Sequence, residues 1–279
     1  MFLPIRSSAR ESLTVSPPRV EFKVVPGQTV TSNIKLENSG DTALDVAIYA
    51  SSFAVKNENY DQEFDQSNNH LTVNNWFKFD QTNYHLLPKT SQLVNYKIEV
   101  PNSAEPGGHY AAVFAQTQAD HSNSGDVVEM KRLASLVYIE VAGEISRQGG
   151  IESLQVSRWQ KSSPIKSQLR LQNSGNTHYR IDGYVGIKNI FGAEVSRSRV
   201  NGLLLPSTTR LFGVENEAPS WPGLYKVEAN IGFPDGKSQV KSNWIIYLPP
   251  LYIYAISLIL IVVVAAAVWR AVNSRRKKV

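Results

Sequence analysis

The sequence predicts an all-β fold, in which two tandem β-sandwiches precede a single transmembrane helix near the C-terminus. Three observations predict it. Apolar and polar residues alternate with a period of two, several short motifs occur twice in the same order, and one apolar run has the length of a bilayer span. A chain of 279 residues, 42% of them hydrophobic, is long enough for two domains.

Period-two alternation dominates the chain before residue 249. In 94–100, Val, Tyr, Ile and Val alternate with Asn, Lys and Glu, and 225–231 shows the same pattern. Successive side chains of a strand point to opposite faces, so each run predicts a half-buried strand. Turn signals such as Pro26-Gly27 and Asp235-Gly236 separate the runs at the spacing typical of a sandwich.

An internal repeat divides this region into two related parts. Its motifs are turns and strand starts, whose residue types turn chemistry already explains. Three matched motifs in one order predict two copies of one domain. The pairs are 36–42 with 171–177, 86–88 with 204–206, and 106–110 with 222–225.

The domain boundaries follow from the repeat and from glycine. Gly149-Gly150, between two strand-like runs, is the preferred linker. The predicted division is 1–9 as a signal-peptide remnant, 10–142 as the first sandwich, 143–150 as a linker, 151–248 as the second sandwich, 249–270 as the transmembrane helix and 271–279 as a basic tail.

The first domain is longer than the second, mainly because of an insertion at Val55–Val73. Long insertions on a rigid sandwich often carry binding residues. The segment is polar, with Tyr60 and Phe64 embedded in it, and these two aromatic residues are the preferred contact candidates.

Three acidic residues in the insertion, Asp61, Glu63 and Asp65, complete the candidate binding set. They alternate like the start of a calcium loop. Gln66 and Thr72 occupy the positions at which an EF-hand requires Gly and Glu, so no metal site is assigned, although an irregular calcium loop stays an alternative.

The apolar run Leu251–Trp269 contains Ser257 as its only clearly polar side chain. As a helix of 19 residues it is about 28 Å long, close to the hydrocarbon thickness of a bilayer. Aromatic and basic residues favour the two interfaces of a membrane. The expected interface anchors are Tyr252, Tyr254, Trp269 and Arg270.

Charge sets the expected topology. Five of the 29 basic residues follow the apolar run, whereas only Lys237 and Lys241 lie shortly before it. The positive-inside rule therefore predicts a cytoplasmic C-terminus and an extracytoplasmic ectodomain at the plasma membrane, a type I topology. Such a chain needs an export signal, and Ser7-Ser8-Ala9 resembles the end of a cleaved one, a hypothesis that translation of the upstream DNA would test.

Composition excludes several functions. The chain has no cysteine, so it has no disulfide and no thiol nucleophile. Without the five tail residues, 24 basic residues balance 24 acidic ones, so the net charge of +5 does not indicate nucleic-acid binding. Catalytic motifs such as GxSxG and HExxH are absent from the sequence, and no enzyme activity, catalytic residue or cofactor is expected.

The tryptophans of the ectodomain could stack on sugar rings if they were exposed. Trp76 and Trp221 each precede a core strand or a proline turn, which favours burial of both side chains.

The turn and strand-end motifs resemble those of the WxL-interacting surface proteins of bacteria. The resemblance rests on Ser16-Pro17-Pro18, Val24-Val25-Pro26-Gly27, the Asn-Ser-Gly turn, Trp76 and Val100-Pro101 followed by Pro106-Gly107-Gly108-His109-Tyr110. It implies two tandem immunoglobulin-like β-sandwiches, the first described as peptidoglycan-binding and the second as host-binding, with a C-terminal transmembrane helix. No ligand-binding residue is implied by it.

The leading hypothesis is a non-enzymatic, membrane-anchored surface protein that binds cell-wall glycan, a partner surface protein, or both. Edge strands could recruit an extended partner segment. The alternative is a membrane-tethered assembly factor or chaperone-like scaffold, since the paired sandwiches also look like periplasmic pilus chaperones. A surface hydrolase is a further alternative, disfavoured by the missing motifs.

Overall fold

The computed structural model describes residues 13–64, 73–118 and 130–276. Two compact units make up the chain. The first runs from the N-terminus to Arg147 and also takes in Ser174–His178 and Leu205–Thr208, and the second contains the rest. The unit boundary after Arg147 lies inside the expected linker 143–150, whereas Gly149 and Gly150 open a strand. Asp65 and the stretch 1–9 lie outside the described residues.

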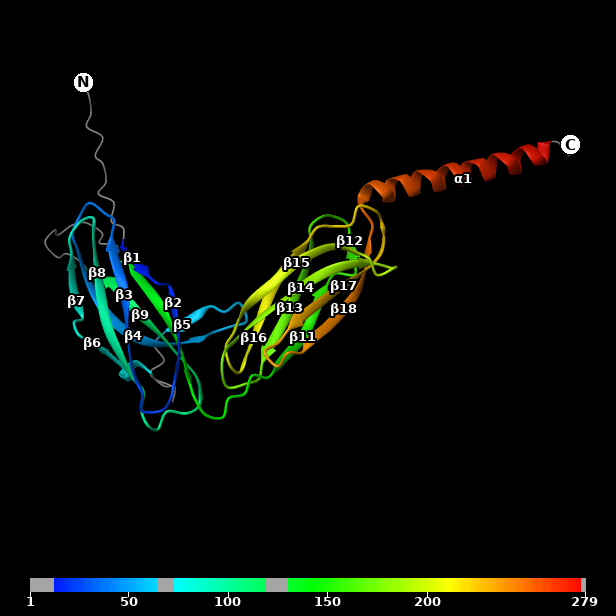
Figure 1. Cartoon of the computed structure of the whole chain (residues 1–279). Coiled ribbons are helices and arrows are strands. Elements are labelled where there is room, and N and C mark those ends of the chain that lie inside the picture. The colour runs from blue at the N-terminus through cyan, green and yellow to red at the C-terminus, as the bar shows by residue number, and fades with distance from the viewer. Residues whose placement is uncertain (1–12, 65–72, 119–129, 277–279) are drawn as a thin grey trace, which may run out of the picture. The chain divides into compact units, whose positions relative to one another are not determined.

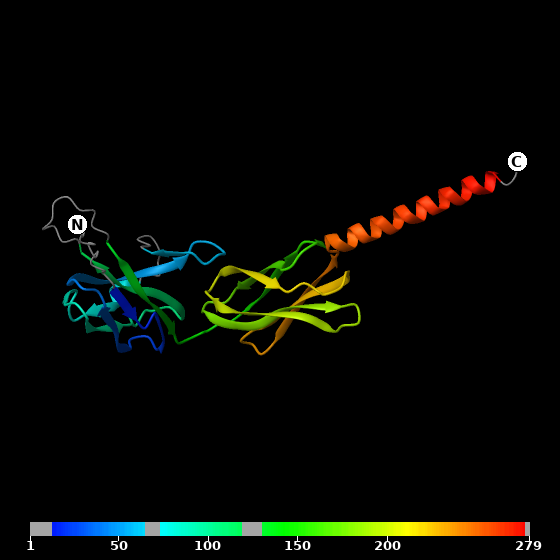
Figure 2. The ribbon, with the colours of Figure 1, turned by 90° about the horizontal axis from the view of Figure 1, so that it is seen from above.

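The first unit is a sandwich of two sheets (Figures 1 and 2). One sheet has the order β1-β3-β8-β6, and the other β2-β10-β9-β4-β5 with β7 also on β4. Their bounds are β1 Leu13–Ser16, β2 Arg19–Val24, β3 Thr29–Asn38, β4 Leu44–Val55, β5 Gln62–Phe64, β6 Phe77–Phe79, β7 Asn83–Leu86, β8 Thr90–Glu99, β9 Gly107–Thr117 and β10 Arg132–Val141, with a 3-10 turn, η1, at Asn74–Trp76.

The core between these sheets confirms the predicted alternation. In β8, Val94, Tyr96 and Ile98 are fully buried, while Asn95 and Lys97 are exposed. The alternate residues of β3, β4, β9 and β10 that face inward complete one continuous apolar cluster. Burial of this cluster is the main favourable term for the unit, since no disulfide supports it.

The second unit is also a sandwich, with a three-stranded sheet in the order β11-β13-β16 and a five-stranded sheet in the order β12-β18-β17-β14-β15. Tyr225, Val227 and Ile231 of β17 are buried, as their alternation predicts. The bounds are β11 Gly149–Val156, β12 Trp159–Gln160, β13 Ile165–Asn173, β14 Tyr179–Asn189, β15 Glu194–Leu204, β16 Thr208–Asn216, β17 Gly223–Gly232 and β18 Ser238–Tyr247.

Both units divide their first strand between two sheets. β1 pairs with β3 in one sheet, and the chain then crosses to the other as β2, which runs parallel to β10. In the second unit β11 pairs with β13, and β12 then runs parallel to β18. Both units therefore have the same arrangement of their first two strands, which agrees with the sequence repeat because related domains keep their strand topology.

The repeated motifs contact each other inside each unit. The carboxamide of Asn38, which is fully buried, donates to the carbonyls of Leu86 (3.2 Å) and Leu87 (3.3 Å). In the second unit the carboxamide of the equally buried Asn173 donates to the carbonyl of Leu204 (3.2 Å). The Asn-Ser-Gly turn and the Leu-Leu-Pro motif therefore recur together because one satisfies the other's backbone.

The apolar run forms α1, Pro250–Arg276 (Figure 1). Its segment Pro250–Arg270 has 21 residues, a mean hydropathy of 2.8 and no part buried against other described residues. By length and composition this helix can cross a membrane, as the sequence predicts.

We expect Asn38→Ala and Asn173→Ala to destabilise the unit that contains each residue. Either change leaves buried carbonyls without their donor, which costs about 1–3 kcal/mol. Urea unfolding of the full chain in detergent measures this. Asn95→Ala, an exposed position on β8, is the matched control, and an equal loss in all three variants would contradict the proposed role.

Candidate functional site

The two aromatic residues proposed from the insertion both make contacts within the first unit. The Tyr60 hydroxyl lies 2.6 Å from Thr208 Oγ1 and accepts a hydrogen bond from the Leu205 N–H at 2.8 Å. Phe64, on β5, packs edge-on against Phe114 with ring centroids 4.9 Å apart. Neither side chain is fully exposed, so the described part of the insertion, residues 55–64, packs on the unit at these two positions.

The acidic candidates are dispersed. Asp61 and Glu63 are exposed, and the Asp61 carboxylate accepts a hydrogen bond from the Asn57 carboxamide at 2.8 Å. Among the described residues no group of three or more His, Asp or Glu side chains could hold a metal ion.

The expected interface anchors Tyr252, Tyr254, Trp269 and Arg270 all lie on α1. Tyr254 and Trp269 are 72% and 66% exposed, as lipid-facing side chains would be. Their position in a bilayer stays a prediction.

Of the two tryptophans expected to be buried, Trp76 is buried and Trp221 is exposed. Trp76 is buried and packs on His109 with ring centroids 4.8 Å apart, as predicted. Trp221, expected to be packed, is instead 70% exposed, so that prediction was wrong. Trp221 lies in the proline turn before Gly223, the first residue of β17, so it does not belong to the alternating residues that the strand buries.

The outer face of the larger sheet in the first unit carries a second layer of aromatic residues. Phe53 packs on Phe64, Tyr110 and Tyr138, and the Arg132 guanidinium lies 4.1 Å from the Phe114 ring centroid. A cavity of about 190 Å3 opens beside this layer. It is lined by Ser52, Phe53, Ala54, Val55, Gly108, His109, Tyr110, Leu205, Pro206 and Thr208.

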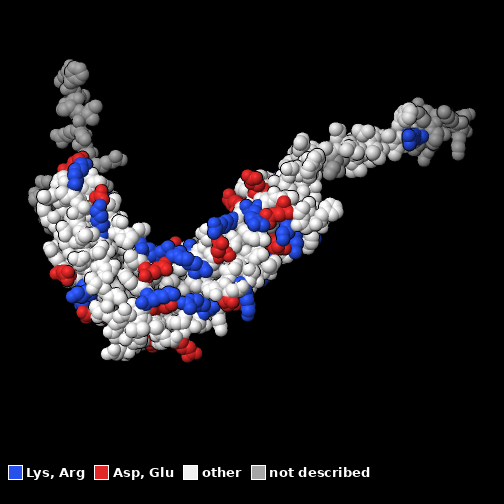
Figure 3. Space-filling model, in the orientation of Figure 1, with Lys and Arg blue, Asp and Glu red and all other residues white. Residues whose placement is uncertain are grey.

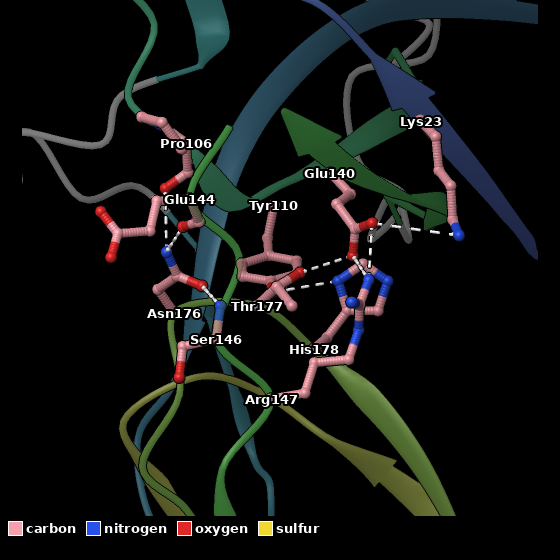
Figure 4. A network of polar contacts seen from close by, with 10 residues as sticks. All are labelled: Lys23, Pro106, Tyr110, Glu140, Glu144, Ser146, Arg147, Asn176, Thr177 and His178. Carbon is pink, nitrogen blue, oxygen red and sulfur yellow. Dashed lines mark hydrogen bonds and ion pairs between the residues drawn. The ribbon is translucent and has the colours of Figure 1, made fainter. Parts of the chain in front are cut away.

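A polar network adjoins this cavity in the first unit (Figure 4). Its charged centre is Glu140, at the end of β10, which accepts hydrogen bonds from Arg147 (2.6 Å) and from the Thr177 hydroxyl (2.9 Å). Lys23 lies 4.0 Å away. Burial alone would raise the pKa of Glu140, but the hydrogen bonds from Thr177 and Arg147 and the two positive charges outweigh it and hold the pKa below its ordinary value.

Asn176 forms the other half of the network. Its carboxamide oxygen accepts from the Ser146 N–H (2.8 Å), and its nitrogen donates to the Glu144 carbonyl (2.8 Å) (Figure 4). The Tyr110 hydroxyl is 3.1 Å from His178 Nδ1, and burial raises the pKa of Tyr110. These contacts attach the segment 174–178 to β10 and to the segment that follows it.

The second unit has one closed side and one open side. On the closed side, three side chains of β18 cap the backbone of β11. Gln239, Lys241 and Asn243 donate to carbonyls of Gly149, Glu152 and Leu154 at 3.1, 2.7 and 2.5 Å.

On the open side, β15 ends the five-stranded sheet and β16 ends the three-stranded sheet. No described strand pairs with the outer edge of β15 over its 11 residues. A groove of about 280 Å3 lies between the two strands, lined by Ser198, Arg199, Val200, Asn201, Phe212, Gly213, Val214 and Glu215.

Two small, uncharged residues, Ser198 and Gly213, line the centre of the groove. The Ser198 hydroxyl crosses it to the Glu215 carbonyl, and a Cβ placed on Gly213 would meet nothing within 4 Å. Its charges are already paired within the unit, Arg199 with Asp182 at 2.9 Å and Glu215 with Lys166 at 3.2 Å. Arg210 also donates to the Leu203 carbonyl at 2.9 Å. The groove therefore offers an edge of β15 without a described strand partner, open space beside Gly213 and no net charge.

Acidic and basic side chains lie side by side on the face of the molecule in Figure 3. No broad patch of one sign appears on that face, in agreement with the balanced charge of the residues before the apolar run.

Sequence reasoning missed the β15 edge and the Glu140 network. Residues 194–204 carry three charges and little alternation, so they do not stand out as a strand with a partner-binding role. The signal that could have found β15 is the Ile190-Phe191-Gly192-Ala193 turn between two strand-length segments.

No protein-family model matches the sequence, and a search of curated proteins gives no match. Solved structures with some likeness include the class 5 fimbriae chaperone CfaA, with 10% identity and a TM-score of 0.46 over 85% of this chain and 100% of that one. The Escherichia coli chaperone DraB has 12% identity and a TM-score of 0.43 over 85% and 97%. The Pseudomonas aeruginosa CupB2 chaperone has 9% and 0.41 over 83% and 100%. Likeness at this level assigns no function to this chain.

We expect Glu140→Gln to flatten the acid limb of the stability profile of the first unit. The carboxylate has a lowered pKa, so its contribution is present above its ordinary value of 4.5 and is lost as pH falls through the lowered value. Thermal unfolding between pH 7 and pH 3 measures it, with the exposed Glu63→Gln as control. An unchanged acid limb in Glu140→Gln would contradict the assignment.

Proposed function

We propose that this chain is a membrane-anchored, non-enzymatic scaffold that holds an extended segment of a partner surface protein. The segment adds to the open edge of β15 and lies in the groove towards β16. The observation that carries the proposal is the 11-residue edge of β15, which no described strand pairs. Strand addition supplies affinity through main-chain hydrogen bonds, and the pockets beside the edge supply specificity.

β15 contains no proline, and no described strand covers its outer edge. Edge strands normally carry inward-pointing charges, proline or a covering loop, because unpaired backbone groups invite other strands. In β15 the side chain directed across the groove is that of Ser198, and Arg197 and Arg199 are held by Glu194 and Asp182 within their own sheet. On the closed side of the same unit three side chains of β18 bond carbonyls of β11. Across the groove Ser198 bonds the Glu215 carbonyl and Arg210 bonds the Leu203 carbonyl, and no described strand pairs with β15 there.

The groove also indicates the class of segment. The local charges are satisfied within the unit, so a charged partner would gain little. Gly213 leaves open space and Phe212 packs towards Gly202, which favours a neutral strand with small or β-branched residues beside Gly213. This deepens the assembly-factor alternative. Binding of cell-wall glycan, which the WxL-interacting resemblance implies, has no comparable geometric support among the described residues.

We expect Ser198→Lys to abolish binding of such a segment. An ammonium group in the groove blocks strand addition and should weaken binding about tenfold or more, which corresponds to roughly 1.4 kcal/mol. Photo-cross-linking from Asn201 in intact cells, followed by mass spectrometry, identifies the segment. Its synthetic peptide should then protect β15 amides from hydrogen exchange in the parent chain and not in Ser198→Lys.

Gln155→Lys, an exposed position on β11, is the control and should bind as the parent does. Cross-links to glycan in place of a peptide, or a peptide that protects β15 equally in Ser198→Lys, would contradict the proposal.

A second prediction concerns topology. The chain has no cysteine, so single cysteines report unambiguously. An impermeant maleimide should label Lys237→Cys in intact cells, and should label Ser274→Cys only after the membrane is opened. The reverse pattern would show that the ectodomain is cytoplasmic.

A further inference from the structure

One end of the second unit carries an unusual density of exposed apolar side chains. We call Trp159, Ile190, Phe191, Trp221, Leu224 and Trp244 the apolar end patch. They are 59%, 59%, 88%, 70%, 46% and 52% exposed, respectively. Scattered exposed apolar residues need no explanation, but a contiguous group marks an interaction surface.

Strand register places Trp159, Leu224 and Trp244 at one end of the five-stranded sheet. Trp159 pairs with Ile246, and Leu224 pairs with the same Ile246 from the other side, so the three lie in one row across β12, β18 and β17. Trp244 is two residues back along β18 on the same face, since the intervening Ile245 is buried.

The β14–β15 turn reaches the same end. Asn189 of β14 pairs with Tyr225 of β17, so the turn that follows Asn189 extends past the start of β17. The Asn189 carboxamide oxygen accepts from the N–H groups of Phe191 and Ala193, both at 3.0 Å. These hydrogen bonds fix the conformation of the turn at residues 190–193, which we call the tip. The exposure of Phe191 therefore follows from the structure of the turn.

The patch must lie close to any membrane that α1 crosses. Only Leu248 and Pro249 separate β18 from α1. Ile246 is four residues before Pro250, a reach of at most about 14 Å for an extended chain. β14 is two strands from β18, or about 10 Å sideways. Chain length alone thus keeps the row and the tip near the point at which the helix enters the bilayer.

The chemistry of the patch matches that of a membrane interface. Tryptophan is enriched at the headgroup level, where its ring is partly apolar and its N–H is hydrated. The exposed Arg158 and Lys161 flank Trp159, and basic side chains beside apolar ones suit an anionic lipid surface.

We propose that the apolar end patch inserts into the headgroup layer of the leaflet that α1 enters, so that the second unit rests on the bilayer. The occupant of the patch is the lipid surface. This inference goes beyond strand addition at β15 and depends only on α1 crossing the membrane.

The test uses the full chain in vesicles of phosphatidylcholine and phosphatidylglycerol with brominated acyl chains. Ala193→Cys, at the tip beside the intact Phe191, carries an environment-sensitive fluorophore. Bromine quenches a fluorophore only near the acyl region, so the label at 193 should lose intensity. A label at Lys237→Cys, about 30 Å away at the other end of β18, should not. A label at Val263→Cys reports insertion of α1.

A second variant tests whether the quenching at position 193 depends on the apolar end patch. Ile190→Ser combined with Phe191→Ser should remove the quenching at 193 while the label at 263 stays quenched. Quenching at 263 without quenching at 193 in the parent chain would overturn the proposal and leave the anchor intact. A 193 signal that responds to added peptidoglycan fragments and not to bromolipid would overturn it in favour of glycan. Absence of quenching at 263 would show that α1 is not inserted, which overturns the premise that α1 crosses the membrane. Protection of β15 amides by a peptide is measured separately, so failure of the strand-addition proposal can be distinguished from failure of this one.

Discussion

The bond between a buried asparagine and a leucine carbonyl is the contact on which each sandwich depends. Asn38 ends β3, and Asn173 ends β13, at the point where the chain leaves one sheet for the other. Each carboxamide satisfies backbone groups of a segment far along the chain, 48 residues away for Leu86 and 31 for Leu204. Carbonyls buried in a turn have no water to bond, so this side chain supplies the donor that they would otherwise lack.

The divided first strand is the second constraint. A strand that serves one sheet and then the other covers only part of each edge, and the remainder must be capped or left open. In the second unit three side chains of β18 cap β11. Across the groove no described strand pairs β15 with β16, and the two strands are linked there through Ser198 to the Glu215 carbonyl and Arg210 to the Leu203 carbonyl. The same topology thus leaves one side capped by β18 and the other side with an unpaired edge of β15 at which we propose strand addition.

The sequence predicted the elements whose cause is local. Burial of Val94, Tyr96 and Ile98 follows from alternation, and the apolar helix from a run without charges. The insertion was recognised, but Phe64 packs on Phe114 through a pairing of β5 with β4 that no local pattern encodes. Exposure of Trp221 and the free edge of β15 depend on which strands become neighbours, and this is decided by the fold as a whole. The Asn-Ser-Gly motif was recognised as a turn, whereas its contact with Leu-Leu-Pro required the structure.

The parallel pairing of β12 with β18 has a mechanical consequence. The chain enters the second unit at Gly149, beside Gln239 near the start of β18, and leaves at the far end of that strand towards α1. A load applied between Gly149 and α1 is therefore directed along the strands, where it shears the β17–β18 ladder and the side-chain bonds to β11 together. Bonds loaded in parallel share the force, whereas bonds opened in sequence fail one at a time. β18, the strand that leads to α1, pairs with β17 on one side and with β12 on the other.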